Sequence, residues 1–212
     1  MIYGLSSTLR YTWPSPRQFR DLVTFTLNTN CIIAVEEARS EATSILQLVS
    51  AHRRGLASVG VVAISASERQ KDGGNLKNFA EFKQKLSWLG LGDLVLLEPM
   101  MYWGVTYWDF GLLSDDKMVS LEREIHHILF PNIQFSWVDH CNNLGLNPET
   151  AKPDKKWRNA KCDVQAFWSH AFRKRDVFVT SDKEFHANMK KQRLVSLSGS
   201  RIETPEGAAK LL

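Results

Sequence analysis

The side chains of this chain that could do chemistry are acids and an amide placed next to predicted strands. Asn28, Glu68 and Asp182 each follow a predicted strand directly or within a few residues. Asp163 precedes an apolar helix that leads into the last of these strands. Because functional groups of an open parallel sheet gather at the carboxyl ends of its strands, we expect these four side chains to converge.

Carboxylates that converge in this way need a cation between them. Two of them about 4 Å apart repel each other by roughly 4 kcal/mol at an effective dielectric near 20. Ligand sets made only of oxygen favour Mg²⁺ or Mn²⁺ over zinc. We therefore expect Glu68, Asp163 and Asp182 to bind such an ion. A divalent ion activates water and stabilises charge on a phosphoryl group, so the expected reaction is phosphodiester hydrolysis.

Strands and helices alternate in the segment around the first acids. Residues 23–27 alternate apolar with β-branched polar side chains, as strands do. Ser40 is the expected cap of a helix whose apolar side chains repeat every three or four residues and which stops at Gly55. Residues 59–64 are a continuous apolar run, typical of a strand buried on both faces. This order predicts a parallel crossover unit.

The C-terminal third repeats the alternation. An apolar helical face over residues 164–172 precedes a strand at 177–179, and a short helical stretch follows near 185–191. A final strand at 201–203 leads into Thr204-Pro205-Glu206, which has the cap and the early proline of a helix start. The fold class is therefore α/β with a mostly parallel sheet.

The middle of the chain is less regular. Residues 76–89 and 118–129 read as amphipathic helices, and residues 94–110 between them are rich in aromatic side chains. These aromatic side chains pack in a core or a subunit interface, or else form a binding surface. We expect one domain over residues 1–212, with an N-terminal arm of about residues 1–20 and an enlarged middle segment of about residues 70–155.

Charge and composition limit the kinds of partner and compartment that we expect for this chain. The net charge is +4 and the isoelectric point about 9.0, which permits a polyanionic partner such as RNA. The apolar stretches are too short to cross a membrane. The N-terminal residues lack the pattern of a signal peptide, and three cysteines without paired spacing suit a reducing compartment. We therefore expect a cytoplasmic protein.

Basic clusters in the sequence are candidate RNA-binding surfaces, because phosphates attract lysine and arginine. Trp157 lies inside one cluster and could stack on an unpaired base; the alternative is a solvated helix face with one half-buried tryptophan. The candidate residues are Arg53, Arg54, Lys155, Lys156, Trp157, Arg158, Arg173 and Lys174.

Several segments together resemble the PIN-domain family of nucleases, including its VapC-type toxins. The resemblance covers about two thirds of the chain and leaves the middle unmatched. The residues that carry it are Leu27-Asn28-Thr29-Asn30, Ser67-Glu68, Asp163 with the helix that follows it, Asp176 to Phe185, and Ile202 to Glu206.

The resemblance implies a PIN-like three-layer fold and a metal-dependent endoribonuclease, the toxin of a toxin–antitoxin or related defence system. Partners would be RNA, a small antitoxin protein and a second copy of the chain in a homodimer. Thr29, Asn30 and Thr180 would support the site.

Asn28 departs from the family, which has aspartate at this position. Asparagine keeps the shape and one oxygen but loses a negative charge, so metal affinity and activity should fall. Asn28 is either an inactivating replacement or natural. In the second case the chain is a catalytically degenerate PIN-like module that binds protein or RNA.

Overall fold

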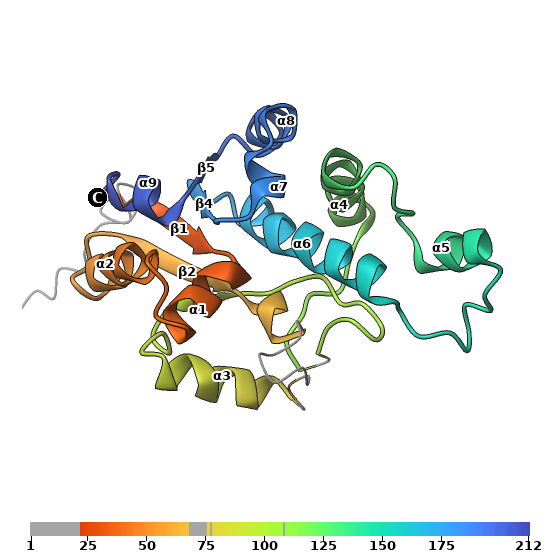
Figure 1. Cartoon of the computed structure of the whole chain (residues 1–212), viewed down its shortest axis with the longest axis horizontal. Coiled ribbons are helices and arrows are strands. Elements are labelled where there is room, and N and C mark those ends of the chain that lie inside the picture. Colours follow the sequence, from red (N-terminus) through yellow and green to blue (C-terminus); the bar gives the residue numbers. More distant parts are fainter. Residues whose placement is uncertain (1–21, 68–75, 77, 108) are drawn as a thin grey trace, which may run out of the picture.

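A parallel five-stranded sheet forms the centre of the protein (Figure 1). The computed structural model describes residues 22–67, 76, 78–107 and 109–212. The strand order is β3-β2-β1-β4-β5. Phe25 in β1 lies opposite Val59 in β2 and Val177 in β4. The α/β class and the parallel sheet are thus confirmed. The strands are β1 (Thr24–Leu27), β2 (Ser58–Val62), β3 (Val95–Leu97), β4 (Val177–Val179) and β5 (Arg201–Glu203).

Helices cover both faces of the sheet, which gives three layers. In Figure 1, α1, α2, α3 and α9 lie on one side, and α4, α6, α7 and α8 on the other. The helices are α1 (Thr29–Glu36), α2 (Ala42–Arg53), α3 (Phe79–Trp88), α4 (Asp116–Leu129), α5 (Trp137–Leu144), α6 (Lys155–Phe172), α7 (Lys183–His186), α8 (Asn188–Ser198) and α9 (Pro205–Ala209); a 3₁₀ helix, η2 (Ala63–Ser67), follows β2.

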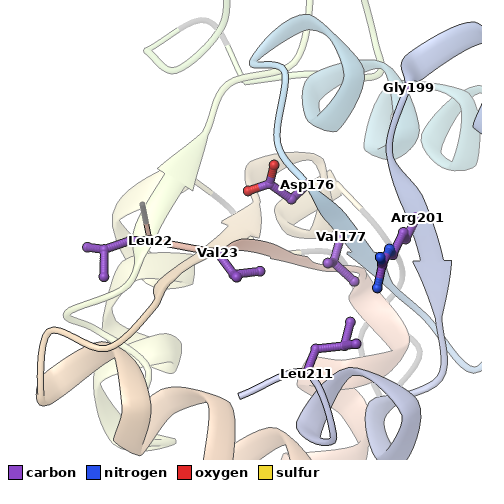
Figure 2. Close-up of a pocket in the computed structure, with 7 residues that line it drawn as sticks. All are labelled: Leu22, Val23, Asp176, Val177, Gly199, Arg201 and Leu211. Carbon is purple, nitrogen blue, oxygen red and sulfur yellow. The ribbon is translucent and has the colours of Figure 1, made fainter. Parts of the chain in front are cut away.

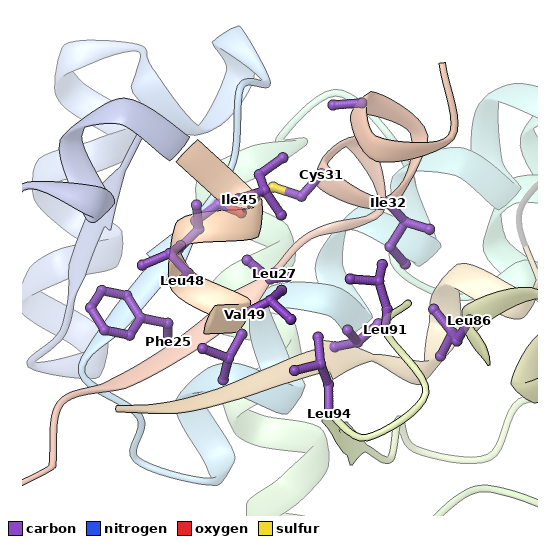
Figure 3. Packing of buried hydrophobic residues seen from close by; sticks show 14 of the residues in the cluster. Phe25, Leu27, Cys31, Ile32, Ile45, Leu48, Val49, Leu86, Leu91 and Leu94 are labelled. Carbon is purple, nitrogen blue, oxygen red and sulfur yellow. Dashed lines mark hydrogen bonds between the residues drawn. The ribbon is translucent and has the colours of Figure 1, made fainter. Parts of the chain in front are cut away.

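The first core lies between the sheet and α2. Phe25 and Leu27 point from β1 toward Ile45, Leu48 and Val49 of α2 (Figure 3). All five side chains are at most 1 % exposed. The apolar spacing seen in the sequence therefore marks the face of α2 that is buried on the sheet.

The second core lies on the opposite face and contains the long helix α6. Phe167 and Trp168 are fully buried there, beside Phe178 of β4. A buried ion pair accompanies this core, with 2.9 Å between Lys161 Nζ and Glu122 Oε1. Alternate residues of a strand face opposite sides, so a three-residue strand such as β4 contributes to both cores.

Several elements differ from the sequence predictions. The first helix after β1, α1, was not predicted, because its eight residues show no clear polar face. Ser40 does not cap α2: the cap position is Glu41, without a side-chain bond to the helix. Ile64 lies in η2 rather than in β2. Residues 194–197 continue α8, so this helix ends seven residues later than expected, at Ser198.

The predicted N-terminal arm and part of the predicted middle segment lie outside the described residues. Within the part that the structure describes, the middle segment contains α3, β3, α4 and α5, and α5 extends away from the sheet (Figure 1). In the same described ranges, every helix is too short or too polar to cross a membrane.

Candidate functional site

The candidate site lies where β1 and β4 end side by side. Asn28 follows β1 and donates its backbone N–H to the oxygen of Val179 at 3.0 Å. Thr180 follows β4 and donates its backbone N–H to Glu203 at 3.0 Å. Chain order reverses between β1 and β4, since β2 and β3 lie on one side and β5 on the other. Ligands of open α/β sheets bind at this kind of switch point.

The hydroxyl of Thr180 is the centre of the site and is fully buried. Three N–H donors point at its oxygen: Asn28 Nδ2 at 3.1 Å, Asn30 Nδ2 at 2.7 Å and the Asp182 backbone at 3.1 Å. A hydroxyl oxygen has two lone pairs. The donors around Thr180 therefore exceed the acceptor capacity of its oxygen by one.

Rotating the two amides does not remove this excess. Asn28 Oδ1 accepts from the Thr29 backbone at 2.8 Å, and Asn30 Oδ1 accepts from the Ser181 backbone at 3.3 Å. Turning either amide would set its NH₂ against a backbone N–H. A carboxylate at position 28 would instead accept from both the Thr29 N–H and the Thr180 O–H. The surroundings of Asn28, which is 3 % exposed, are therefore complementary to an acid.

Two further contacts join this edge to η2 and α6. Thr29 Oγ1 and Ser65 Oγ are 2.7 Å apart. Arg158 donates from α6 to the backbone oxygen of Ser67 at 2.7 Å. Glu68, the next residue, lies outside the described residues. Ser67, the last described residue before Glu68, therefore lies against the helix that carries Asp163.

Asp182 is half-buried and caps α7, since its Oδ1 accepts from the Glu184 backbone at 2.9 Å. This cap is the structural role that acids commonly have at helix starts. The cap does not use Oδ2. His186 fixes the same turn, because its Nε2 lies 2.8 Å from the Thr180 backbone oxygen. Nothing in the sequence pattern pointed to His186, and Ser65 was signalled only by its place after β2.

Asp163 lies well inside α6 rather than before it, because the helix begins at Lys155. Its side chain is partly buried. Among the residues that the structure describes, no group of three His, Cys, Asp or Glu could hold a metal ion. With Glu68 outside that set, the described part of the proposed ligand group consists of Asp163 and Asp182.

Half of the predicted RNA-binding residues lie at the wrong edge of the sheet. Arg53 is the last residue of α2 and Arg54 follows it, shortly before β2; Arg173 and Lys174 directly follow α6, shortly before β4. Both pairs are therefore at the amino ends of the strands, opposite Asn28. Sequence reasoning overlooked that a parallel crossover helix runs back toward the strand start.

Two of these arginines also have acidic partners. Arg53 Nε lies 2.7 Å from Asp93 Oδ2, and this bond lowers the pKa of Asp93 to about 2. Arg173 pairs with Glu98 at 2.5 Å. Both cations are thus engaged in structural ion pairs at the amino edge.

Trp157 does not present a stacking surface. Its side chain is 3 % exposed, and its Nε1 donates to the backbone oxygen of Gln134 at 3.0 Å. The prediction that Trp157 stacks on a base is therefore wrong. Lys155 and Lys156 beside it are exposed at the start of α6, and Arg158 faces Ser67. Of the basic residues predicted to bind RNA, this cluster lies toward the candidate site.

A hollow of about 390 Å³ lies at the opposite, amino edge of the sheet (Figure 2). Its acid, Asp176, is already bonded: Oδ2 accepts from Thr24 N at 2.8 Å and from Thr24 Oγ1 at 2.6 Å. Asp176 therefore ties β4 to β1 at their starts. The carboxyl edge, where three donors meet one hydroxyl oxygen, is therefore the candidate site.

Comparisons of the chain with models of protein families, with curated proteins and with solved structures found no match. The functional assignment therefore depends on the geometry of the site.

Proposed function

We propose that this chain is a metal-dependent endoribonuclease of the PIN type whose activity is weakened by Asn28. The observation that carries the proposal is the donor excess at Thr180, which a carboxylate at position 28 would remove. That position ends the central strand at the switch point of the sheet, where the other proposed acids are expected.

The donor chemistry of the site fits Mg²⁺ or Mn²⁺. Asp182 has Oδ2 outside its helix cap, and Asp163 and Glu68 would supply further carboxylate oxygens. These hard oxygen donors match hard divalent cations. When bound, such an ion would activate a water molecule and stabilise the phosphoryl charge.

The residues of the chain itself would hold and orient this site. Thr180 fixes the turn that carries Asp182, since the Asp182 backbone donates to its hydroxyl. Arg158 holds the backbone at Ser67, next to Glu68. Lys155 and Lys156 are exposed beside this contact and would attract the phosphates of RNA.

The resemblance alone supports the finer parts of the proposal: a toxin of a toxin–antitoxin pair, a small antitoxin as partner, a homodimer and a cytoplasmic location. Of these parts, the toxin assignment has the premise that the site cleaves RNA, and the cleavage test bears on that part alone.

The test is an RNA cleavage assay on the purified chain, Asn28→Asp, and the double variant Asn28→Asp with Asp182→Asn. We expect Asn28→Asp to cleave RNA with Mg²⁺ or Mn²⁺, and EDTA or the second substitution to abolish cleavage. Activity of the unchanged chain should be much lower. A folded Asn28→Asp protein that leaves RNA intact with every metal would refute the proposal.

A second candidate function is a catalytically degenerate module that docks a partner. The exposed apolar side chains of α5 favour it, with Val138 53 % and Leu144 55 % exposed. In this case Asn28 is natural, and Asn28→Asp would gain neither metal response nor activity. The same assay therefore separates the two functions.

A further inference from the structure

A second hollow, which we name the lysine pocket, lies between the end of α4 and the first turns of α6 and α8. Its volume is about 350 Å³, the size of a small-molecule site. Apart from Asn132 and two lysines, its lining is apolar. The lining residues are Leu129, Phe130, Pro131, Asn132, Ile133, Lys156 and Lys190.

The apolar floor of the pocket is held in place by hydrogen bonds. Phe130 donates its backbone N–H to His126 at 2.7 Å, and Ile133 donates to Phe130 at 3.1 Å. The ring of His126 fixes the other end of this turn, since its Nε2 lies 2.7 Å from the backbone oxygen of Ile133. A ligand would therefore enter a shape that is already formed.

The two lysines give the pocket a positive rim. Lys156 is exposed on the first turn of α6. Lys190 Nζ lies 5.9 Å from the centre of the Phe130 ring and also forms an ion pair with Glu184. An apolar floor under two cations is complementary to a ligand with a flat apolar body and a negative charge.

We propose that the lysine pocket binds one unpaired base of single-stranded RNA, with the neighbouring phosphates on Lys156 and Lys190. The choice of RNA rests on the proposed function. The pocket volume suits a single nucleotide, and a base would stack on Phe130 once Lys190, whose Nζ lies over this ring, turns to a phosphate.

The position of Lys190 supports this choice over other anions. Lys190 pairs with Glu184, whose backbone N–H is bound by Asp182. One rim lysine of the pocket thus borders the segment that carries a proposed metal ligand, so one RNA strand would contact both. Lys156 and Arg158 lie two residues apart on α6 and face different sides of the helix, so the Arg158 contact does not add to this link.

The test measures RNA binding without cleavage, by anisotropy of a labelled single strand of about eight nucleotides in EDTA. Lys156→Gln with Lys190→Gln removes the rim, and Lys155→Gln with Lys191→Gln removes the same charge from adjacent positions outside the lining. We expect the first pair to weaken binding about tenfold more than the second. Equal losses would show diffuse attraction to the phosphates and overturn the proposal.

Two further measurements probe the floor and the ion pair. AMP should compete with the RNA at concentrations where inorganic phosphate does not, and equal competition would overturn the role of the apolar floor. Glu184→Gln releases Lys190, so it should tighten binding several-fold. If AMP displaces the labelled RNA and an acidic peptide does not, the result supports RNA as the ligand of the pocket. If the acidic peptide alone displaces the RNA, the result refutes this ligand.

These results are independent of catalysis. If Lys156→Gln with Lys190→Gln loses RNA binding while Asn28→Asp is inactive, the proposal of an RNA-binding pocket holds and the proposal of a nuclease is refuted. If Asn28→Asp is active while the two rim lysines make no difference to RNA binding, the proposal of a nuclease holds and the proposal of an RNA-binding pocket is refuted.

Discussion

Asn28→Asp should convert the protein from one that divalent metals stabilise weakly into one that they stabilise strongly. The substitution keeps the side-chain shape and changes the group that faces Thr180 from a donor to an acceptor. Thr180 then keeps two donors, from Asn30 and Asp182, and donates its own O–H to the new carboxylate. Every hydrogen-bonding group of this cluster is then satisfied.

The expected magnitude follows from the contacts of Asn28. Removing one surplus buried donor is worth about 1–3 kcal/mol, and each bond to a charged acceptor about 1.5–3 kcal/mol. Burying a carboxylate at a position that is 3 % exposed costs several kcal/mol. Without metal these terms nearly cancel. A cation at 100 times its dissociation constant adds about 2.7 kcal/mol, which for a chain of this size raises Tm by roughly 5–10 °C.

Thermal unfolding of the parent and of Asn28→Asp, each with EDTA, Mg²⁺ or Mn²⁺, measures this effect. Asn30→Asp is the matched control, because it adds the same charge to the same cluster and also relieves Thr180 of one donor. We expect the metal to stabilise Asn28→Asp much more than this control. Equal Tm shifts in both variants would refute a site built around position 28, and so would the absence of any shift.

Three further predictions concern buried groups elsewhere. Lys161→Met leaves Glu122 charged and buried without its cation, so urea unfolding should show a loss of about 3–5 kcal/mol that Glu122→Leu largely restores. Burial lowers the pKa of His170 to about 3. The contribution of neutral His170 to stability is therefore complete above pH 6.5 and is lost by about 1.4 kcal/mol per pH unit as the pH falls toward 3. The free energy of unfolding of His170→Gln should depend less on pH over this range. Trp157→Ala should lower the free energy of unfolding by about 3–5 kcal/mol, with a loss that a surface residue would not show.

Strands β2 and β4 were predictable because they are nearly continuous apolar runs, and β1 because its apolar side chains alternate with threonine; β3 was not predicted. Strands buried on both faces carry no polar side chains to obscure them, as in residues 59–62 of β2. The boundaries failed where an apolar run continues into another element: Ile64 is as buried in η2 as any residue of β2. Periodicity cannot separate a buried strand from the buried helical turn that follows it.

The site was predictable in part, because strand ends are visible in the sequence and their edge follows from the parallel topology. Asn28 was found in this way, whereas Asn30 and Thr180 were expected from the resemblance; both amides donate to the Thr180 hydroxyl. The predicted position of half of the basic residues was wrong, because the sequence shows that a cluster is basic but does not show which edge of the sheet the cluster reaches. To place Arg53 and Arg173 one must know the direction in which the neighbouring helices run. To judge Trp157 one must know that its side chain is buried in the second core.

Polar groups at the amino edge of the sheet are mostly paired, although Arg175 Nε is buried there without a partner among the described residues, whereas the carboxyl edge has three donors around one oxygen. At the amino edge, Arg53, Arg173 and Asp176 each have a partner of opposite charge or polarity in the fold. At the carboxyl edge, the donors around Thr180 outnumber the available lone pairs, although Asn28 lies in a buried position where unsatisfied groups are costly. Under the proposed function, this imbalance is what an amide leaves in the place of an acid of a metal site. Restoring the charge at the carboxyl edge should then restore the chemistry.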